Sequence, residues 1–338
     1  MAKNFPVLPV PVTDGMPGGM MISDAAIRDG MAFLVGELEK RDEKLHEPLT
    51  SVTWPRDMPV RTGGGWVDSV SVFDVSYATS GGSNGGLIGP ESNELPIMQA
   101  DIGKDSYKTL QWGNTLKVPL IDQQKLQKIG RNLDDVLNKG LHLAHDKMLD
   151  GSVYQGFANM GTYGLVNDPH ITTVTAAPHT NGGTDTEWEH KTPQEILEDL
   201  NRVLRTTWAA AEYDLSGMAN HVLIPPAQYT RLVETELSEG SGVSILTYLL
   251  ENNLAKNQGN QLFIGPSRWC EGAGTSGADR LVAYCNDEDR VRMDITVPLQ
   301  RMMTQASAEH LAYLTPYVTQ FSELQWVYRQ HAMYMDGI

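Results

Sequence analysis

The segment at residues 107–171 constrains the fold more than any other part of the chain. It begins with β-forming residues that end near Pro119, continues into a long amphipathic helix and ends in a glycine-rich loop. The helix is predicted at residues 132–150, and at ~1.5 Å per residue it would be roughly 28 Å long. A helix of that length is typical of a structural spine. The segment has no pattern typical of a nucleophile, a metal site or a phosphate site.

Apolar residues of the predicted helix recur every three or four positions, so they share one face. They are Leu133, Leu137, Leu141, Ala144 and Met148. The other faces are charged, with Arg131, Asp134, Asp135, Lys139, Asp146 and Lys147. The pattern predicts an amphipathic helix.

The length and charge of the chain limit what it can bind. With 338 residues and ~150 residues per domain as a guide, we expect two lobes on one polypeptide. Lys and Arg total 26 against 42 Asp and Glu, a formal net charge of −16, and no basic cluster interrupts the acidity. A protein that reads nucleic-acid sequence normally presents a basic face, because neutralising phosphates supplies most of its affinity. If this chain encloses DNA, its charge favours containment without a grip on the duplex.

Cysteine usage and hydropathy predict the compartment. Cys270 and Cys285 are the only cysteines, too few for a disulfide framework, which favours a reducing environment. Prolines at 6, 9 and 11 interrupt the apolar residues that a signal peptide would need in one run. No stretch approaches the ~20 apolar residues of a membrane span. We therefore expect a protein made and used in the cytoplasm, without a membrane partner.

The first third of the chain predicts an arm and a β-excursion. Residues 1–22 are rich in Pro and Gly and predict an extended arm, followed by a helix at 23–46 and a connector to residue 65. Residues 66–79 alternate apolar and polar side chains like a strand, and a glycine-rich run at 80–86 interrupts it. A β-like segment at 107–119 could return beside it. Because an isolated two-stranded ribbon is marginally stable, we expect it to lie on another surface.

The second half predicts a mixed α/β lobe. Thr192-Pro-Gln-Glu195 is a capping box with proline at the first helical position. The helix that follows, to about residue 213, places five residues on one face: Ile196, Leu200, Val203, Leu204 and Thr207. Further helices are predicted at 227–236 and 244–253, and strands at 221–224, 261–265, 280–285, 291–295 and, less regularly, 324–334.

Two patterns invite a catalytic or phosphate-binding interpretation. Residues 81–85 match the G-x-S-x-G pattern of a serine hydrolase, with Ser83 as nucleophile. That site needs a helix directly after the serine, but Gly86-Leu-Ile-Gly-Pro90 cannot begin a regular one. Glycine-rich runs at 81–86 and 272–277 lack the G-K-[ST] that binds phosphate and magnesium, so both are predicted to be loops.

Two groups of side chains resemble metal ligands. His142, His145 and Asp146 lie within about one helical turn, but no further ligands match them, and a solvated or interface face of the helix is expected instead. The other group is acidic and lacks the alternating oxygen pattern of a calcium loop. It contains Asp185, Glu187, Glu189, Glu195, Glu198 and Asp199. Part of it complements a helix N-terminus. We expect no catalytic, cofactor or metal site.

A family resemblance lies in the order and spacing of short motifs along nearly the whole chain. The motifs are Lys117-Val-Pro-Leu-Ile-Asp122, Gly164-Leu-Val-Asn167, residues 217–232, Phe263-Ile-Gly-Pro266, residues 287–298 and Tyr334-Met-Asp-Gly-Ile338. In this order they resemble the major capsid proteins of tailed phages, and in particular an encapsulin-like branch of that family.

The resemblance implies an α+β, HK97-like capsid fold in five parts. Residues 1–50 would form an N-terminal arm and helix, and 51–116 a connector and an extended β-loop. Residues 117–170 would form a peripheral domain with the spine helix, 171–297 a mixed α/β axial domain, and 298–338 the return to the peripheral domain.

It also implies a structural subunit without enzymatic activity or cofactor. Copies would self-assemble as pentamers and hexamers into the icosahedral capsid of the virion, in the host cytoplasm, around double-stranded DNA that is not bound sequence-specifically. Portal, scaffolding and cement proteins would be further partners. The alternative with the same architecture is an encapsulin-type cargo shell. The alternative from another class is a serine hydrolase that uses Ser83.

Some relatives in this family join subunits by an isopeptide bond from a lysine on the extended loop to an asparagine of a neighbour. Residues 66–99 contain no lysine, and Lys104 and Lys108 follow only on the returning strand. We expect the particle to be held by non-covalent contacts. These lysines are interpreted as solvated charges that protect a β-edge against wrong pairing.

Overall fold

The computed structural model describes residues 51–80, 97–122, 133–180, 183–238, 242–307 and 309–338. Residues Ser51–Ile338 form one compact unit, separate from Met1–Thr50. The predicted arm at 1–22, the predicted helix at 23–46 and the glycine-rich run at 81–86 lie outside the described residues. In the part of the chain that is described, no helix combines the length and the apolar character that crossing a membrane requires.

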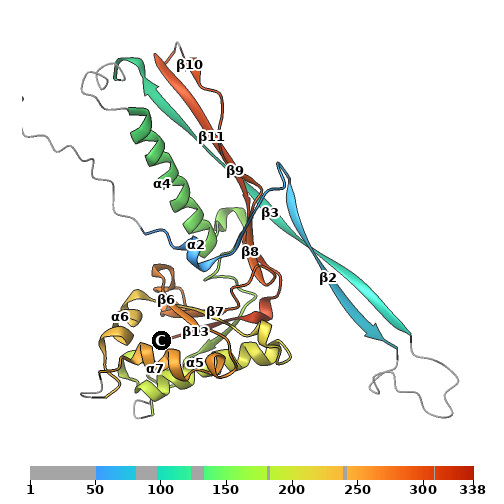
Figure 1. The fold of residues 1–338 in the computed structure, drawn as a ribbon, viewed down its shortest axis with the longest axis vertical. Helices are drawn as coiled ribbons and strands as arrows, with labels where there is room; N and C mark the ends of the chain where they lie inside the picture. The colour runs from blue at the N-terminus through green and yellow to red at the C-terminus, as the bar shows by residue number, and fades with distance from the viewer. Residues whose placement is uncertain (1–50, 81–96, 123–132, 181–182, 239–241, 308) are drawn as a thin grey trace, which may run out of the picture. The chain divides into compact units, whose positions relative to one another are not determined.

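A long antiparallel sheet contains both segments of the predicted β-excursion, but of the predicted return at 107–119 only residues 107 and 108 lie beside the first segment (Figure 1). Its order is β10 (Gln305–Ser307), β11 (Ala312–Ser322), β3 (Met98–Pro119) and β2 (Ser69–Thr79), and β9 (Val297–Arg301) also pairs with β11. β3 changes partner near its middle. Residues 98–108 pair with β2, and residues 109–119 pair with β11. The first half of β3 and β2 therefore form a two-stranded ribbon.

The predicted spine helix is α4 (Leu133–Tyr154), which continues about one turn beyond the predicted end. It packs against β3 and β11, where Leu141 lies in a cluster with Leu116 and Tyr317. The predicted apolar stripe is wrong at Ala144, which is exposed, whereas His145 is buried. Leu141, His145, Leu149 and Val153 are buried at intervals of four residues, and with 3.6 residues per turn each interval moves the buried stripe about 40° around the helix.

A second sheet has the order β4 (Thr172–Thr175), β13 (Ala332–Asp336), β7 (Arg280–Tyr284), β5 (His221–Ile224) and β6 (Phe263–Pro266). Every residue of β5, β7 and β13 is buried. Successive side chains point to opposite faces: Val222 packs in one core cluster and Leu223 in another. The sheet is thus covered on both faces, which explains why these strands are apolar at nearly every position.

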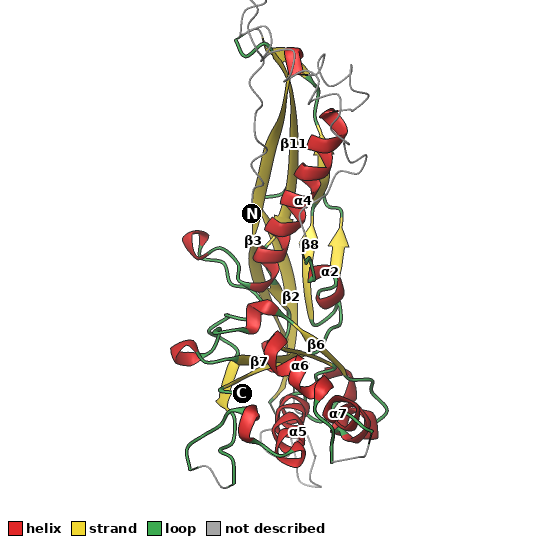
Figure 2. Cartoon of the chain, turned by 90° about the vertical axis from the view of Figure 1, so that its left-hand side faces the viewer, coloured by secondary structure: helices red, strands yellow, loops and turns green. Residues whose placement is uncertain are grey.

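Helices cover one face of the second sheet (Figure 2). They are α5 (Pro193–Ala210), α6 (Pro226–Glu234), α7 (Ile245–Asn252) and α8 (Leu254–Asn257). The capping box of α5 is confirmed, since the Thr192 hydroxyl accepts from the backbone N–H of Glu195 and the Thr192 N–H donates to the Glu195 carboxylate. All five residues of its predicted apolar face are buried.

The last turns of α4 and a small sheet cover the opposite face. The small sheet has the order β1 (Val60–Thr62), β8 (Val291–Ile295) and β12 (Gln325–Trp326), and α2 (Trp54–Asp57) precedes it. Leu149, Val153 and Tyr154 of α4 share the core there with Val291 and Met293. Short 3₁₀ helices occupy Ala158–Met160, Trp188–His190, Leu215–Gly217, Arg268–Cys270, Thr275–Gly277 and Arg329–His331.

Two sequence-based strand assignments need correction. The returning strand begins at Met98, not at residue 107, because its first half carries Asp101, Gly103 and Asp105, which have low strand propensity. The predicted strand at 324–334 is two strands, β12 and β13, with a 3₁₀ turn between them. Apolar residues are common on both sides of that turn, so their number alone did not reveal the interruption.

Candidate assembly surfaces

The two-stranded ribbon has two chemically different faces. In an antiparallel pair, directly opposed residues point to the same side. We call the side with Ser71, Phe73, Val75, Tyr77 and Thr79 of β2 the odd face and the other side the even face. Opposite the odd-face residues lie Ser106, Lys104, Ile102, Ala100 and Met98. On the even face, Val70, Val72, Asp74, Ser76 and Ala78 lie opposite Tyr107, Asp105, Gly103, Asp101 and Gln99.

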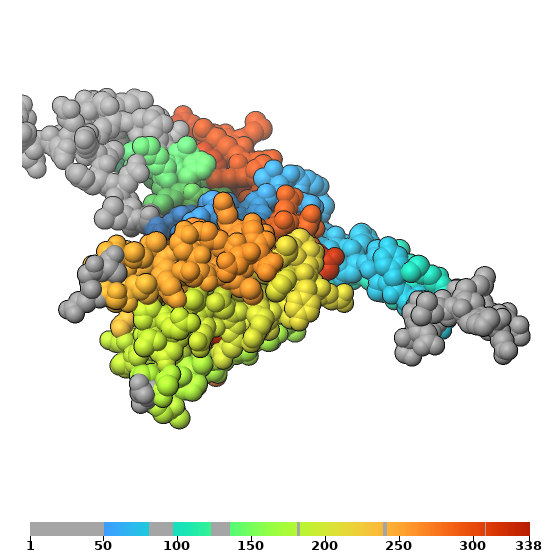
Figure 3. Space-filling view, turned by 60° about the horizontal axis from the view of Figure 1, so that its bottom comes forward, coloured from blue at the N-terminus to red at the C-terminus, as the bar shows by residue number. Residues whose placement is uncertain are grey.

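The odd face is apolar and uncovered away from the base of the ribbon. Relative exposure is 65% for Phe73, 70% for Tyr77, 72% for Met98 and 66% for Ile102. In the space-filling view of Figure 3 the ribbon's blue and cyan atoms stand clear of the helices of the second sheet. Contiguous exposed apolar surface of this kind is rare on a monomer and marks an interaction site.

The base of the ribbon is anchored to the rest of the unit. The Tyr107 hydroxyl donates to the Trp326 carbonyl at 2.7 Å, and burial raises the pKa of Tyr107 to about 12. Next to it, the Lys108 N–H donates to the Glu323 carboxylate at 2.7 Å. The ammonium of Lys108 donates to the Met160 carbonyl at 3.2 Å. These contacts fix the direction in which the ribbon leaves the unit.

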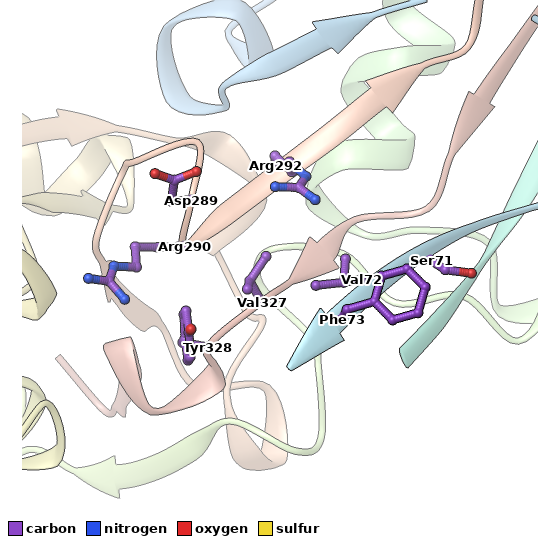
Figure 4. Close-up of a pocket in the computed structure, with 8 residues that line it drawn as sticks. All are labelled: Ser71, Val72, Phe73, Asp289, Arg290, Arg292, Val327 and Tyr328. Carbon is purple, nitrogen blue, oxygen red and sulfur yellow. The ribbon is translucent and has the colours of Figure 1, made fainter. Parts of the chain in front are cut away.

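A notch of about 580 Å³ lies beside β2 at this base (Figure 4). Ser71, Val72 and Phe73 line one side, and Asp289, Arg290, Arg292, Val327 and Tyr328 line the other. Arg290 donates to the Ser216 hydroxyl at 3.0 Å and lies over the Tyr328 ring at 5.0 Å. Arg292 donates to the Gln325 side chain at 3.2 Å. Both guanidinium groups are thus engaged within the chain and stabilise the wall of the notch.

Two buried carboxylates hold α2 between the spine helix and the second sheet. Asp150, near the end of α4, accepts from the backbone N–H groups of Thr53 and Trp54 at 3.0 and 3.2 Å. Arg268 and Trp269 also donate to Asp150, at 3.0 and 2.9 Å. Because a helix N-terminus presents unpaired N–H groups, the Asp150 carboxylate caps α2 from another element.

Asp57, at the end of α2, is the second carboxylate and is fully buried. It accepts from Arg56, from the Tyr154 hydroxyl and from His221 Nε2 at 3.1 Å. Burial by itself would raise the pKa of Asp57, but the hydrogen bonds from His221, Arg56 and Tyr154 outweigh it and hold that pKa below its usual value. Asp57 therefore joins the α2 turn, the spine helix and β5 as a charged acceptor.

The histidines of the spine helix face the sheet. The His145 ring packs edge-on against Trp112 at 5.4 Å, and the His142 ring against Tyr317 at 6.4 Å. His145 also pairs with Asp146 at 3.4 Å. Burial lowers the pKa of His145 despite this neighbour. On the predicted solvated or interface face, His142 is exposed, whereas His145 is buried against Trp112 of β3 and is not solvated.

The acidic run at 185–199 is divided among separate structural roles. Asp199 is buried and accepts from the Lys191 ammonium and from Trp188 Nε1 at 3.3 Å. Glu195 caps α5. Asp185, Glu187 and His190 each place one potential ligand atom within 4.8 Å of the other two. His190 pairs with Asp185 at 2.6 Å. The run is therefore not one convergent site.

Two sequence candidates remain, Ser83 and the glycine-rich run at 272–277. Ser83 lies outside the described residues. The second glycine-rich run holds a carboxylate of its own chain: the N–H and the hydroxyl of Thr275 both donate to Asp336 at 2.9 Å. A Cβ at Gly274 would lie 2.8 Å from the Ala278 carbonyl and 2.9 Å from Asp336, which explains the glycine there.

Sequence reasoning found half of the exposed ribbon face. It identified the alternation of Phe73, Val75 and Tyr77 but missed Met98 and Ile102 on the paired strand. Their signal was present as apolar residues at 98, 100 and 102 alternating with polar ones, hidden by the glycine and charged residues that follow. Asp57 and Asp150 gave no local signal, because their partners other than Arg56 lie about 100 or more residues away.

Solved capsid structures share this fold. The capsid of Myoviridae phage XM1 aligns with a TM-score of 0.73 at 16% identity, covering 95% of this chain and 100% of that chain. The capsid of a native GTA particle aligns at 0.60 with 8% identity, covering 91% and 98%. Gordonia phage Cozz aligns at 0.56 with 16% identity, covering 96% and 98%.

At the level of sequence, no curated protein matches the chain. The family model described as major capsid protein matches residues 84–338, about three quarters of the length. That span contains the spine helix, the whole second sheet and every strand of the long sheet except β2. The chain belongs to the major capsid protein family.

Proposed function

We propose that this structural subunit assembles with copies of itself, as pentamers and hexamers, into a closed icosahedral shell around the double-stranded DNA of a phage. Membership of the capsid family supports a shell-forming role. The observation on this chain that carries the proposal is the ribbon, whose apolar odd face has no cover within the described residues. A strand pair that is marginal alone becomes stable when it lies on a neighbour.

Within the proposed shell we assign parts to the chain as follows. Residues 1–50 form the arm, 51–116 the connector and extended loop, 117–170 the peripheral domain, and 171–297 the axial domain. Residues 298–338 return to the peripheral domain. They also contribute to the axial domain, because β11 lies in the long sheet and β13 lies beside β7. No catalytic role is assigned to any residue. We propose assembly in the host cytoplasm, with portal, scaffolding and cement proteins as further partners.

Assembly is tested by sedimentation of the purified chain over a range of micromolar concentrations, followed by negative-stain imaging. We expect pentamers, hexamers or closed shells. A compact monomer at every concentration and at several salt concentrations would contradict the proposal. Shells that retain a folded cargo protein and no DNA from the expressing cell would favour the encapsulin-type alternative.

Containment of DNA follows from charge. A subunit with a net charge of −16 should bind duplex DNA weakly at physiological salt, because it releases few counterions from the phosphates. A fluorescence-anisotropy titration of unassembled subunits checks this. A submicromolar complex at ~0.15 M salt would contradict it.

We also propose that the shell is held by non-covalent contacts. Lys108 is engaged with Met160, and the Lys104 ammonium lies 5.9 Å from the centre of the Phe73 ring on its own ribbon. Boiled particles should run as single subunits in denaturing electrophoresis. A ladder of multimers that survives reductant would exclude this part of the proposal.

A further inference from the structure

The alternation of apolar residues along β2 changes phase at Val72 and Phe73. Up to this point the apolar residues are Val70 and Val72, on the even face. Beyond it they are Phe73, Val75 and Tyr77, on the odd face. Because side chains of a strand alternate with a period of two, a shift of one residue moves the apolar surface to the other side.

The paired strand changes phase at the same level of the ribbon. Near the base its apolar residue is Tyr107, on the even face. Further out its apolar residues are Ile102, Ala100 and Met98, on the odd face. Two strands with the same change form a ribbon that presents one apolar face at its base and the opposite one beyond it.

At the base, the even face is the one that the chain itself covers. Val72 is 8% exposed and Tyr107 is 7% exposed, and the Tyr107 hydroxyl bonds to Trp326. The odd face at this level carries Ser71, Ser106, Ser69 and Lys108, which are suited to water. The first phase of the pattern is therefore explained by contacts within the subunit.

Beyond the base, the two faces also differ in charge. Here the even face carries two carboxylates, Asp74 and Asp101, and no basic residue, while Asp105 lies opposite Val72 at the base. The odd face carries one charge, the ammonium of Lys104, beside the Phe73 ring. The second phase of the pattern is not explained by contacts within the described residues. Its large apolar side chains are between 49% and 72% exposed.

We propose that the distal odd face, formed by Phe73, Val75, Tyr77, Ile102 and Met98, docks on a second copy of this chain, and that the distal even face with Asp74 and Asp101 stays in solvent. This rests on the proposed function and adds which side of the ribbon makes the contact. The ribbon then holds its own subunit with one face and its neighbour with the other.

Charge identifies the occupant. A second copy carries a net charge of −16, so its surface is acidic on average. The distal even face would bring two further carboxylates against that surface, which is unfavourable. The odd face offers apolar area and one ammonium, which is the complement of an acidic, partly apolar neighbour. Nucleic acid would need more than one positive charge on the face that meets it.

The test compares substitutions at neighbouring positions on opposite faces. Val75→Ser with Ile102→Ser alters one facing pair on the odd face, and Asp74→Ser with Asp101→Ser alters the adjacent positions on the even face. We expect the odd-face double variant to raise the protein concentration needed for assembly roughly 100-fold. The reason is that assembly of this variant no longer buries two apolar side chains. The even-face variant should assemble like the unmodified chain, within about threefold.

Circular dichroism and thermal unfolding of unassembled subunits must show both double variants folded like the unmodified chain. If the odd-face variant is not, the single variants Val75→Ser and Tyr77→Ser replace it. Equal assembly by the odd-face variant, or equal loss by the even-face variant, would overturn the assignment of faces while leaving the proposed function intact. Failure of the unmodified chain to assemble would instead contradict the proposed function.

A photo-crosslinking residue identifies what covers each face. Benzoyl-phenylalanine at position 77 should yield a covalent dimer of the chain after illumination of assembled protein. The same residue at position 76, on the even face, should yield at least tenfold less. Capture of nucleic acid or of a different protein by position 77, in place of a second copy, would overturn the proposed occupant.

Discussion

The second sheet and the ribbon have similar apolar residues in opposite circumstances. Strands β5, β7 and β13 are buried at every position. Helices α5 to α8 cover one face of their sheet, and the last turns of α4 with the small sheet cover the other. In the ribbon, Phe73 and Tyr77 remain largely exposed. The apolar content of a strand therefore shows that a partner surface exists. The phase of its alternation shows whether that surface lies in the same subunit.

The largest expected effect comes from a buried charge pair at the second sheet. Lys191 and Asp199 are each 1% exposed as side chains. Asp199→Asn leaves the ammonium without its counter-charge, and the free energy of unfolding should fall by about 3–5 kcal/mol. Urea denaturation of unassembled subunits measures it. Asp101→Asn on the ribbon is the matched control and should change that free energy by less than ~0.5 kcal/mol.

A smaller difference is expected for apolar truncation. Leu200 is 1% exposed in the core under the second sheet, whereas Ile102 is 66% exposed on the ribbon. Leu200→Ala should lower the free energy of unfolding by about 2–5 kcal/mol. Ile102→Ala should lower it by less than ~0.5 kcal/mol in the unassembled subunit. Similar losses for the two variants in chemical denaturation would show that the ribbon is covered within its own subunit.

Glycines sharpen the same contrast. A Cβ at Gly164 would lie 2.3 Å from the backbone carbon of Tyr154, whereas at Gly103 it would lie 3.8 Å from its nearest neighbour, Asp74. We expect Gly164→Ala to lower the free energy of unfolding by about 1–3 kcal/mol through overpacking. Gly103→Ala should be close to neutral. Equal melting temperatures for the two variants would count against the tight packing after α4.

The smallest effect is a pH dependence confined to the body of the subunit. Burial lowers the pKa of His145, and that of His331 as well, below the ordinary value near 6.5. Below that pH the unfolded chain binds protons before the folded chain does, so the free energy of unfolding falls as the pH is lowered. Residues 66–119 contain no histidine, so the ribbon does not contribute.

Denaturation midpoints of unassembled subunits at pH 7.5 and 5.5 measure this slope. His145→Gln removes the buried imidazole beside Trp112 and should reduce the dependence on pH. The groups that face this ring are Asp146 and His142, so Asp146→Asn is the control for their influence. An unchanged slope in His145→Gln would show that another group titrates in this range.

The sequence predicted elements whose signals are local. The capping box at Thr192, the strand at 221–224 and the strand at 291–295 depend on neighbouring residues, and the structure confirms them. Features that depend on distant partners were missed. β11 was not predicted, because Thr315, Thr319 and Gln320 are buried by pairing and packing and not by their own hydrophobicity.

The candidate surface shows the same limit. Alternation predicted one strand of the ribbon, but the register that aligns Val75 with Ile102 joins two separate segments and follows only from the structure. The burial of Tyr107 likewise depends on β12, more than 200 residues later. Only with both facts could the two faces of the ribbon be distinguished.

The pairing of distant strands also sets the order in which the subunit can fold as it is synthesised. β2 and the first half of β3 pair residues that are close in sequence. The second half of β3 can pair only after β11 has been made, about 190–210 residues downstream. β13 lies between β4 and β7 in the second sheet, so that sheet also stays open until residue 336 has been made. Pairings at such separation form slowly. A nascent chain can therefore pair β2 with β3 early, but the anchor of Tyr107 on Trp326 that fixes the direction of the ribbon forms only at the end of translation.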